Sequence, residues 1–131
     1  MKKLFLPAIL IFALASCKKE DSCTLSATSI EGTYKVTSVK LNGTEVFNNS
    51  AFFDACERDD TYTLAANNVA VYTDAGVSCG GSSPLVDTWT LSGNTLTIAG
   101  EASTVTSFGC TQVVTTSSFG GGSEVITYVR Q

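Results

Sequence analysis

From Glu31 onward, apolar side chains alternate with Thr, Ser and Lys in short runs that clusters of Gly, Asn and Ser separate. No helical period is sustained along this stretch, and the alternation is typical of half-buried β-strands. The pattern predicts eight strands: Gly32–Leu41, Thr61–Ala65, Val69–Thr73, Leu85–Leu91, Thr95–Ile98, Ser103–Phe108, Thr111–Thr116 and Glu124–Arg130. Eight short strands at regular spacing suggest a sandwich or a barrel, and we expect an all-β, eight-stranded antiparallel up-and-down barrel.

The first predicted strand changes parity half-way along. Tyr34 and Val36 fall on one face, whereas Val39 and Leu41 fall on the other. An extra residue near positions 37–38 would bring all four side chains onto one face, and such a bulge bends a strand. We therefore expect a bent first strand that serves both ends of the barrel.

One predicted hairpin can be tested by the arithmetic of its register. Asn67-Asn68 suits a two-residue type I′ turn, which needs positive φ at both positions. Partner numbers then sum to 135, so that Leu64 faces Val71. The same register carried outward places Cys56 opposite Cys79. Directly opposed strand residues lie about 5.5 Å apart, within disulfide range, so we expect a Cys56–Cys79 disulfide.

A second hairpin follows from the turn Gly93-Asn94. Its partner numbers sum to 187, which sets Leu91 against Leu96 and Trp89 against Ile98. Both registers give apolar cross-strand pairs on one face, and such pairs stabilise a sheet. The sequence therefore predicts that these side chains point into the barrel.

The inward positions form either the core or a binding cup. A barrel of eight strands is just wide enough to be filled by side chains or to hold one small ligand. Mostly medium to large side chains at these positions favour the filled barrel, whereas aromatic rings with hydroxyl groups would also suit a small apolar pocket. The candidate ligand-binding residues are Tyr34, Tyr62, Leu64, Val71, Trp89, Leu91, Leu96, Ile98 and Tyr128.

The N-terminus has the form of a secretory signal peptide. Two lysines precede an apolar run of eleven residues, Leu4 to Leu14. At about 1.5 Å per residue this run spans about 17 Å, roughly half of a ~30 Å hydrocarbon core, which is too short for a transmembrane helix. The junction Leu14-Ala15-Ser16-Cys17 resembles the lipobox of bacterial lipoproteins. The resemblance implies cleavage after residue 16 and acylation of Cys17, which would anchor the chain in a lipid bilayer.

A short charged run, Lys18-Lys19-Glu20-Asp21-Ser22, follows the lipobox and contains no apolar residue to pack. We expect residues 17–29 to be a lipidated tether and residues 30–131 to be the barrel domain. The run is also similar to the export signals of some Gram-negative lipoproteins. That similarity implies an outer-membrane location, with the domain facing the cell exterior.

The cysteines fit an oxidising compartment. Setting Cys17 aside leaves four cysteines, which allow three pairings. If Cys56 pairs with Cys79, then Cys23 pairs with Cys110, which would tie the tether to the barrel wall. The competing reading is a zinc site, but the sequence contains no C-x-x-C pair and export disfavours free thiols.

Composition excludes much chemistry. The 131 residues include no histidine, so Ser-His-Asp and Cys-His catalysis and His-ligated metals are excluded. The net charge of −4 argues against nucleic-acid binding. Glu57, Asp59, Asp60 and Asp74 lack the spacing of a calcium loop, so we expect a solvated acidic rim. We expect no catalytic residues, no metal, no cofactor and a monomeric chain.

Three stretches, Ile30–Val39, Cys56–Thr63 and Thr88–Ile98, resemble the lipocalin-like domain of small bacterial lipoproteins. Gly32-x-Tyr34 stands where the broader lipocalins carry Gly-x-Trp, whose aromatic ring plugs the closed end of the barrel. The resemblance implies the barrel fold and the export route.

Two functions remain open at this point. The first is a membrane-anchored, lipocalin-like binding protein for a small apolar ligand. The alternative is an interaction or accessory module with a solid barrel and no small-molecule ligand, whose loops contact a partner protein at the cell surface. The longest irregular stretch, residues 77–84, would then carry such contacts, because loops on a rigid barrel are where partner contacts usually lie.

Overall fold

A computed structural model describes residues 23–131 of the chain. The predicted signal peptide (residues 1–16), the lipidation site Cys17 and the charged run that follows it lie outside the described residues. In chain order the elements are α1 (Ala27–Ile30), β1 (Gly32–Leu41), β2 (Thr44–Glu45), η1 (Ala55–Glu57), β3 (Thr61–Ala65), η2 (Ala66–Asn68), β4 (Val69–Thr73), β5 (Leu85–Ser92), β6 (Thr95–Ile98), β7 (Glu101–Phe108), β8 (Gln112–Phe119) and β9 (Gly122–Arg130).

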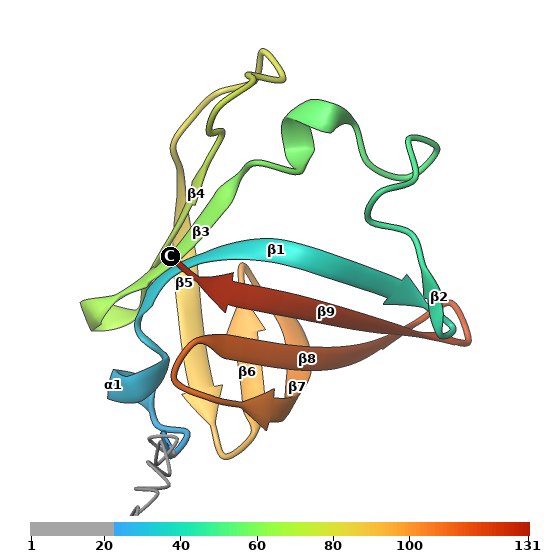
Figure 1. The fold of residues 1–131 in the computed structure, drawn as a ribbon. Coiled ribbons are helices and arrows are strands. Elements are labelled where there is room, and N and C mark those ends of the chain that lie inside the picture. The colour runs from blue at the N-terminus through green and yellow to red at the C-terminus, as the bar shows by residue number, and fades with distance from the viewer. Residues whose placement is uncertain (1–22) are drawn as a thin grey trace, which may run out of the picture.

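The strands form a closed antiparallel barrel (Figure 1). From β3 to β9 each strand pairs with the next in sequence, and β1 pairs with both β3 and β9. The two-residue β2 only adds a small hairpin to the end of β1. The barrel proper therefore has the eight strands that the alternation predicted.

The two ends of the barrel are built differently (Figure 1). One end carries α1 and the turns at residues 66–68, 93–94 and 109–111, and we call it the closed end. The other carries the segment 42–60, the loop 74–84 and the turns at residues 99–100 and 120–121, and we call it the open end. Short turns and a helical turn cover the first, whereas long segments surround the second.

Most of the predicted strand geometry is confirmed. Four of the eight predicted strands have the observed bounds, and the other four differ by one to three residues at one or both ends. The bulge is present, because Val36 pairs with Tyr128 and Ser38 with Thr127, which leaves Thr37 as the extra residue. The Gly93-Asn94 hairpin has the predicted register, in which Trp89 pairs with Ile98.

The predicted register of the first hairpin, between β3 and β4, is wrong by one residue. Leu64 pairs with Ala70 instead of Val71, so that partner numbers sum to 134. Both Asn67 and Asn68 have positive φ, at 62° and 63°, but Ala66 also leaves the strand, and the loop has three residues. Strand alternation then places the Val71 side chain on the same face as Val86, which is 67% exposed. The prediction that Val71 points inward is therefore wrong.

The two predicted disulfides are present. Cys56 is bonded to Cys79, with their Cα atoms 5.3 Å apart, and Cys23 to Cys110, with their Cα atoms 5.1 Å apart. Cys56 lies in η1 and Cys79 in a loop, so neither is a strand residue as the register argument required. One bond therefore joins two segments of the open end, and the other ties the chain before α1 to the β7–β8 turn.

The closed end is capped by α1, which the alternation did not predict and which lies mostly within the expected tether. Ser26 caps this turn by accepting a hydrogen bond from the Ser29 main-chain amide, 3.1 Å away. Ile30, the last residue of α1, has no exposed surface. A helix of four residues is too short to show a hydrophobic period, so the sequence pattern could not predict it.

Arg130 of β9 holds α1 onto the barrel. Its guanidinium donates hydrogen bonds to the carbonyl oxygens of Ser29 and Glu31, at 2.6 and 2.7 Å, and to the Tyr34 hydroxyl, at 2.8 Å. It also lies 5.1 Å from the centre of the Tyr34 ring. Tyr34 donates in turn to the Ile30 carbonyl at 2.7 Å. An aromatic residue therefore plugs this end, as the Gly32-x-Tyr34 motif implied.

Candidate functional site

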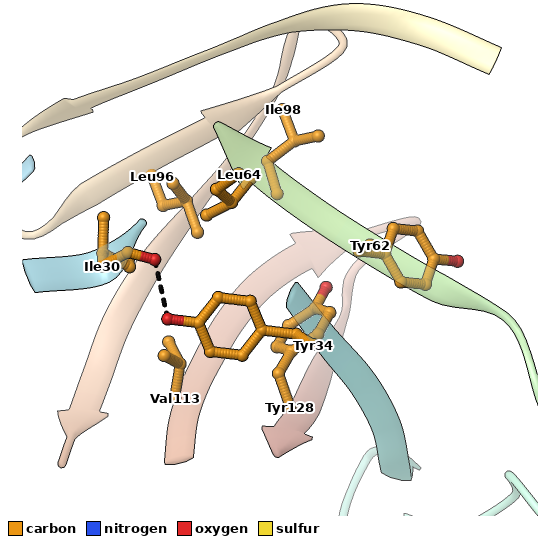
Figure 2. A pocket seen from close by; sticks show the side chains of 8 residues that line it. All are labelled: Ile30, Tyr34, Tyr62, Leu64, Leu96, Ile98, Val113 and Tyr128. Atoms are coloured by element: carbon orange, nitrogen blue, oxygen red, sulfur yellow. Dashed lines mark hydrogen bonds between the residues drawn. The ribbon is translucent and has the colours of Figure 1, made fainter. Parts of the chain in front are cut away.

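The half of the barrel next to the closed end is filled with side chains. Around Tyr34, residues of five strands and α1 leave a cavity of only about 20 Å³, which is room for about one water molecule (Figure 2). The hydroxyl end of Tyr34 points to the carbonyl of Ile30, between Leu96 and Val113. No small molecule fits in this half.

The half next to the open end keeps free space beside a second group of buried side chains, Val39, Val46 and Phe47. Three adjoining hollows of about 190, 260 and 190 Å³ line the inner walls of the strands. Each is smaller than the pockets of about 300–1,000 Å³ that usually hold a small ligand, so a ligand would occupy more than one of them. Each hollow shares lining residues with its neighbours, and we call the space around these shared residues the cup: Tyr62, Tyr72, Ile98, Glu124, Ile126 and Tyr128.

Three tyrosines pack together in the cup. Tyr62 and Tyr72 are cross-strand partners on β3 and β4, with ring centres 5.3 Å apart. The Tyr128 ring meets Tyr62 edge to face, with centres 6.1 Å apart. Burial, and after it the charges of Asp60 and Glu57, raise the pKa of the Tyr62 phenol above its ordinary value. The phenol is therefore neutral at physiological pH and offers a ring face and a hydroxyl.

The acidic residues of the open end do more than form a solvated rim. Asp60 is only 2% exposed and accepts hydrogen bonds from the Tyr72 hydroxyl and from the Ala75 amide. This hydrogen bond with Asp60 is the main reason why the pKa of Tyr72 is raised. The expectation of a solvated rim is wrong for Asp60, because its neighbours across the β3–β4 hairpin bury it.

Two further carboxylates hold the loop 74–84. Asp59 accepts from the Val77 amide at 2.8 Å, and Asp74 accepts from the Ser78 hydroxyl at 2.8 Å and from the Cys79 amide at 3.2 Å. Within residues 23–131, no three His, Cys, Asp or Glu side chains are grouped closely enough to hold a metal ion. These carboxylates therefore shape the mouth of the cup.

The predicted site residues lie at several levels of the barrel, and four of them line both the small cavity and the cup. Trp89 is 2% exposed, donates to the Ala65 carbonyl at 2.8 Å and lines neither the small cavity nor the cup. Leu91 packs against the same core. The predicted residues that line at least one of the three hollows are Tyr62, Leu64, Val71, Ile98 and Tyr128. Tyr34, Leu64 and Leu96 line the small cavity.

Sequence reasoning missed half of the cup. Tyr72, Glu124 and Ile126 each line two of its three hollows, and Thr115, which is 2% exposed, lines one. A signal was available, because strand alternation from Tyr128 along β9 places Ile126 and Glu124 on the same inner face. Ile126 and Glu124 line the cup only because β9 pairs with β1, and the local sequence pattern does not predict that pairing.

An eight-stranded antiparallel barrel with one end plugged and a cup at the other is a small up-and-down β-barrel, an architecture just wide enough to be filled by side chains or to hold one small ligand. The family model described as the lipocalin-like domain matches residues 30–121. The chain therefore belongs to the lipocalin-like domain family. No curated protein matches it.

In the part of the chain that the structure describes, no helix has the length and apolar character needed to cross a bilayer.

Proposed function

We propose that this chain is a lipid-anchored lipocalin-like protein of the outer membrane that binds one small, largely apolar molecule in its cup. The observation that carries the proposal is the contrast between the two halves of the barrel. The half at the closed end has about 20 Å³ of free space, whereas the half at the open end has three adjoining hollows. A barrel without a ligand would be more stable if side chains filled this space, because unfilled interior volume lowers stability.

The position of the Cys23–Cys110 disulfide relates the anchor to the cup. Cys17 precedes Cys23 by six positions, and six residues reach at most about 22 Å. Cys110 lies in the β7–β8 turn at the closed end, so an acylated Cys17 would hold that end within about 22 Å of the bilayer surface. The mouth of the cup would then face away from the membrane, open to a ligand from solution.

Metabolic labelling with a fatty acid tests the anchor. We expect the chain to carry the label and to fractionate with the outer membrane, and the Cys17→Ser variant to lose both properties. Ser16→Ala is the matched control, because a small residue before the cysteine preserves the lipobox. Label retained in Cys17→Ser would refute the anchor without touching the proposed binding function.

A panel of fatty acids, retinoids and haem-like compounds, screened by thermal unfolding and calorimetry, tests the binding function. A ligand at a hundredfold excess over Kd stabilises a protein by about 2.7 kcal/mol, which a melting curve detects. Trp89 emission is a poor reporter, because Trp89 lies outside the cup. Ile126→Trp should abolish binding by filling the cup. Val125→Trp, the same change on the outer face of β9, should preserve it.

A second candidate function rests on exposed apolar side chains at the open end. Phe52, Val77, Leu85, Val86 and Phe119 are each at least 50% exposed, and all belong to segments or strand ends around the mouth. Such clustering is typical of contact surfaces for partner proteins. If the panel leaves the melting temperature unchanged, a photo-crosslinking residue at position 119 should capture a partner on intact cells, and one at position 104 on the outer wall should not.

A further inference from the structure

The charged residues that line the cup are all acidic. Across the three hollows they are Glu57, Asp60, Asp87, Glu101 and Glu124. The described residues contain four basic side chains, Lys35, Lys40, Arg58 and Arg130, and none of them lines these hollows. Asp60 is buried and Glu124 half-buried, whereas Glu57, Asp87 and Glu101 are exposed. The cup therefore carries negative charge on its walls and at its mouth, and none of the described basic side chains lines it.

One of these carboxylates is buried in the wall of the cup. Asp60 is 2% exposed, and the groups that donate hydrogen bonds to it, the Tyr72 hydroxyl and the Ala75 amide, are both neutral. A buried charge without an opposite charge is costly, and this cost falls when a cation enters the adjoining space. This observation on a single buried group is independent of the number of acidic residues around it.

The tyrosine cluster adds a second kind of attraction for positive charge. The faces of aromatic rings carry negative potential, and cages of two or three rings hold ammonium groups. The centre of the Tyr62 ring lies 5.3 Å from that of Tyr72 and 6.1 Å from that of Tyr128. Glu124 lines the same hollows as Tyr128, and its charge contributes, after burial and Tyr62, to the raised pKa of that phenol.

We propose that the ligand of the cup is a small organic cation, an amine or quaternary ammonium compound with an apolar body. This inference rests on the proposed binding function and narrows its ligand class. The cationic head lies among the three tyrosines, Glu124 and Asp60, and the apolar body lies along Ile98 and Ile126. A metal ion does not fit, because in residues 23–131 no three carboxylates are close enough to coordinate one.

The experiment compares three compounds that share one apolar body: 4-phenylbutylamine, 4-phenylbutanol and 4-phenylbutyrate. At pH 7 their head groups are cationic, neutral and anionic. Calorimetric titration of the full mature protein in detergent should give a Kd for the amine at least tenfold lower than for the alcohol, and no binding of the carboxylate. The preference for the amine should weaken as salt is added, because salt screens charges.

Two pairs of variants separate the site from the overall charge of the protein. Glu124→Gln keeps an acceptor for the Ser117 hydroxyl, which now lies 3.1 Å from the carboxylate, and should weaken amine binding about fivefold or more. Glu31→Gln also removes one negative charge, but beside α1 at the closed end, and should change the Kd for the amine less than twofold. Tyr62→Leu should weaken amine binding, whereas Tyr62→Phe, which keeps the ring, should not.

The outcomes distinguish this inference from the function on which it rests. If the alcohol or the carboxylate binds as tightly as the amine, and Ile126→Trp abolishes that binding, the cup binds ligands but the cation preference is refuted. If Glu31→Gln weakens amine binding as much as Glu124→Gln does, the preference comes from net charge and the inference is refuted. If none of the three compounds binds, the inference is refuted, and the wider panel alone decides the binding function.

Discussion

The two disulfides differ in what they cross-link, and removing each should have a different effect. We consider the double variants Cys23→Ser with Cys110→Ser, and Cys56→Ser with Cys79→Ser. The first bond spans 87 positions of the chain and the second spans 23. A longer closed loop restricts the unfolded chain more, so its removal should destabilise the protein more.

The loop lengths give the magnitudes. With a loss of entropy of about 2.1 + 1.5R ln n cal/mol/K, the bond between Cys23 and Cys110 contributes about 4.6 kcal/mol and the bond between Cys56 and Cys79 about 3.4 kcal/mol at 25 °C. Small domains have total stabilities of about 5–15 kcal/mol. Loss of the Cys23–Cys110 bond therefore removes a large share of the stability. Loss of the Cys56–Cys79 bond should lower the free energy of unfolding by about 1.2 kcal/mol less than that.

Urea unfolding under non-reducing conditions measures both quantities. The protein contains one tryptophan, and Trp89 is 2% exposed, so its emission reports loss of the core. The assay should rank the free energies of unfolding as wild type, then the Cys56–Cys79 deletion, then the Cys23–Cys110 deletion. Both variants should show a larger denaturant slope, because an unlinked chain exposes more surface when it unfolds.

The places of the two bonds in the fold add a second readout. The Cys56–Cys79 bond joins η1 to the loop 74–84 at the mouth of the cup, so its deletion should weaken ligand binding in conditions where the variant is folded. The Cys23–Cys110 bond lies at the closed end and should leave binding unchanged. Equal or reversed losses of stability would refute the loop-entropy reasoning, and equal effects on binding would refute the assignment of the two bonds to opposite ends.

Three further predictions concern the closed end and the β1–β2 hairpin. Ile30→Ala should lower the free energy of unfolding by about 2–5 kcal/mol, because it empties a fully buried site, and urea unfolding measures the loss. Arg130→Met should lower it by about 2–3 kcal/mol, because the carbonyls of α1 and the Tyr34 hydroxyl lose a charged donor. Glu45→Gln should cost stability at pH 7 and lose its effect in acid. The Ser38 hydroxyl is the main cause of the lowered pKa of the Glu45 carboxyl, so that the carboxylate stabilises the fold above its unfolded pKa and the contribution disappears as pH falls through the lowered folded value.

Each of these predictions has a contrary outcome. An Ile30→Ala loss below about 1 kcal/mol would show that α1 does not seal the core. An Arg130→Met variant as stable as the wild type would show that the hydrogen bonds of the guanidinium do not hold α1 onto the barrel. A Glu45→Gln effect that persists unchanged at pH 2 would show that the carboxylate acts through packing alone.

Local alternation was enough to predict the strands, because one face of almost every strand meets the core. It failed in one register, since Val69, Ala70 and Val71 are all apolar and either parity buries a hydrophobic residue. The Cys56–Cys79 bond was predicted correctly from that wrong register, because both segments leave the same hairpin in the same direction. The one-residue error in the register therefore left the predicted disulfide correct, but it made the predicted orientation of the Val71 side chain wrong.

The cup could be predicted only in part. Tyr62 and Tyr128 were expected to point inward, but the number and size of inward side chains favoured a filled barrel. At the closed end α1 and Arg130 cover the barrel, whereas at the open end Val46 and Phe47 of the segment 42–60 pack against Val39 and leave space beside them. Such unequal filling is set by long-range packing, and neither periodicity nor composition reports it.

The pairing of β1 with β9 has a consequence for the way the chain acquires its structure. Partners such as Lys35 and Val129 are 94 positions apart, so the barrel closes through contacts of high sequence separation. Such contacts form slowly, because closing a long loop costs conformational entropy before any favourable contact is made. During synthesis, β1 is made long before β9, so one of its edges stays unpaired and Tyr34 stays uncovered until β9 forms. A chaperone that shields this edge would therefore raise the yield of folded protein most when β9 is the last strand to arrive.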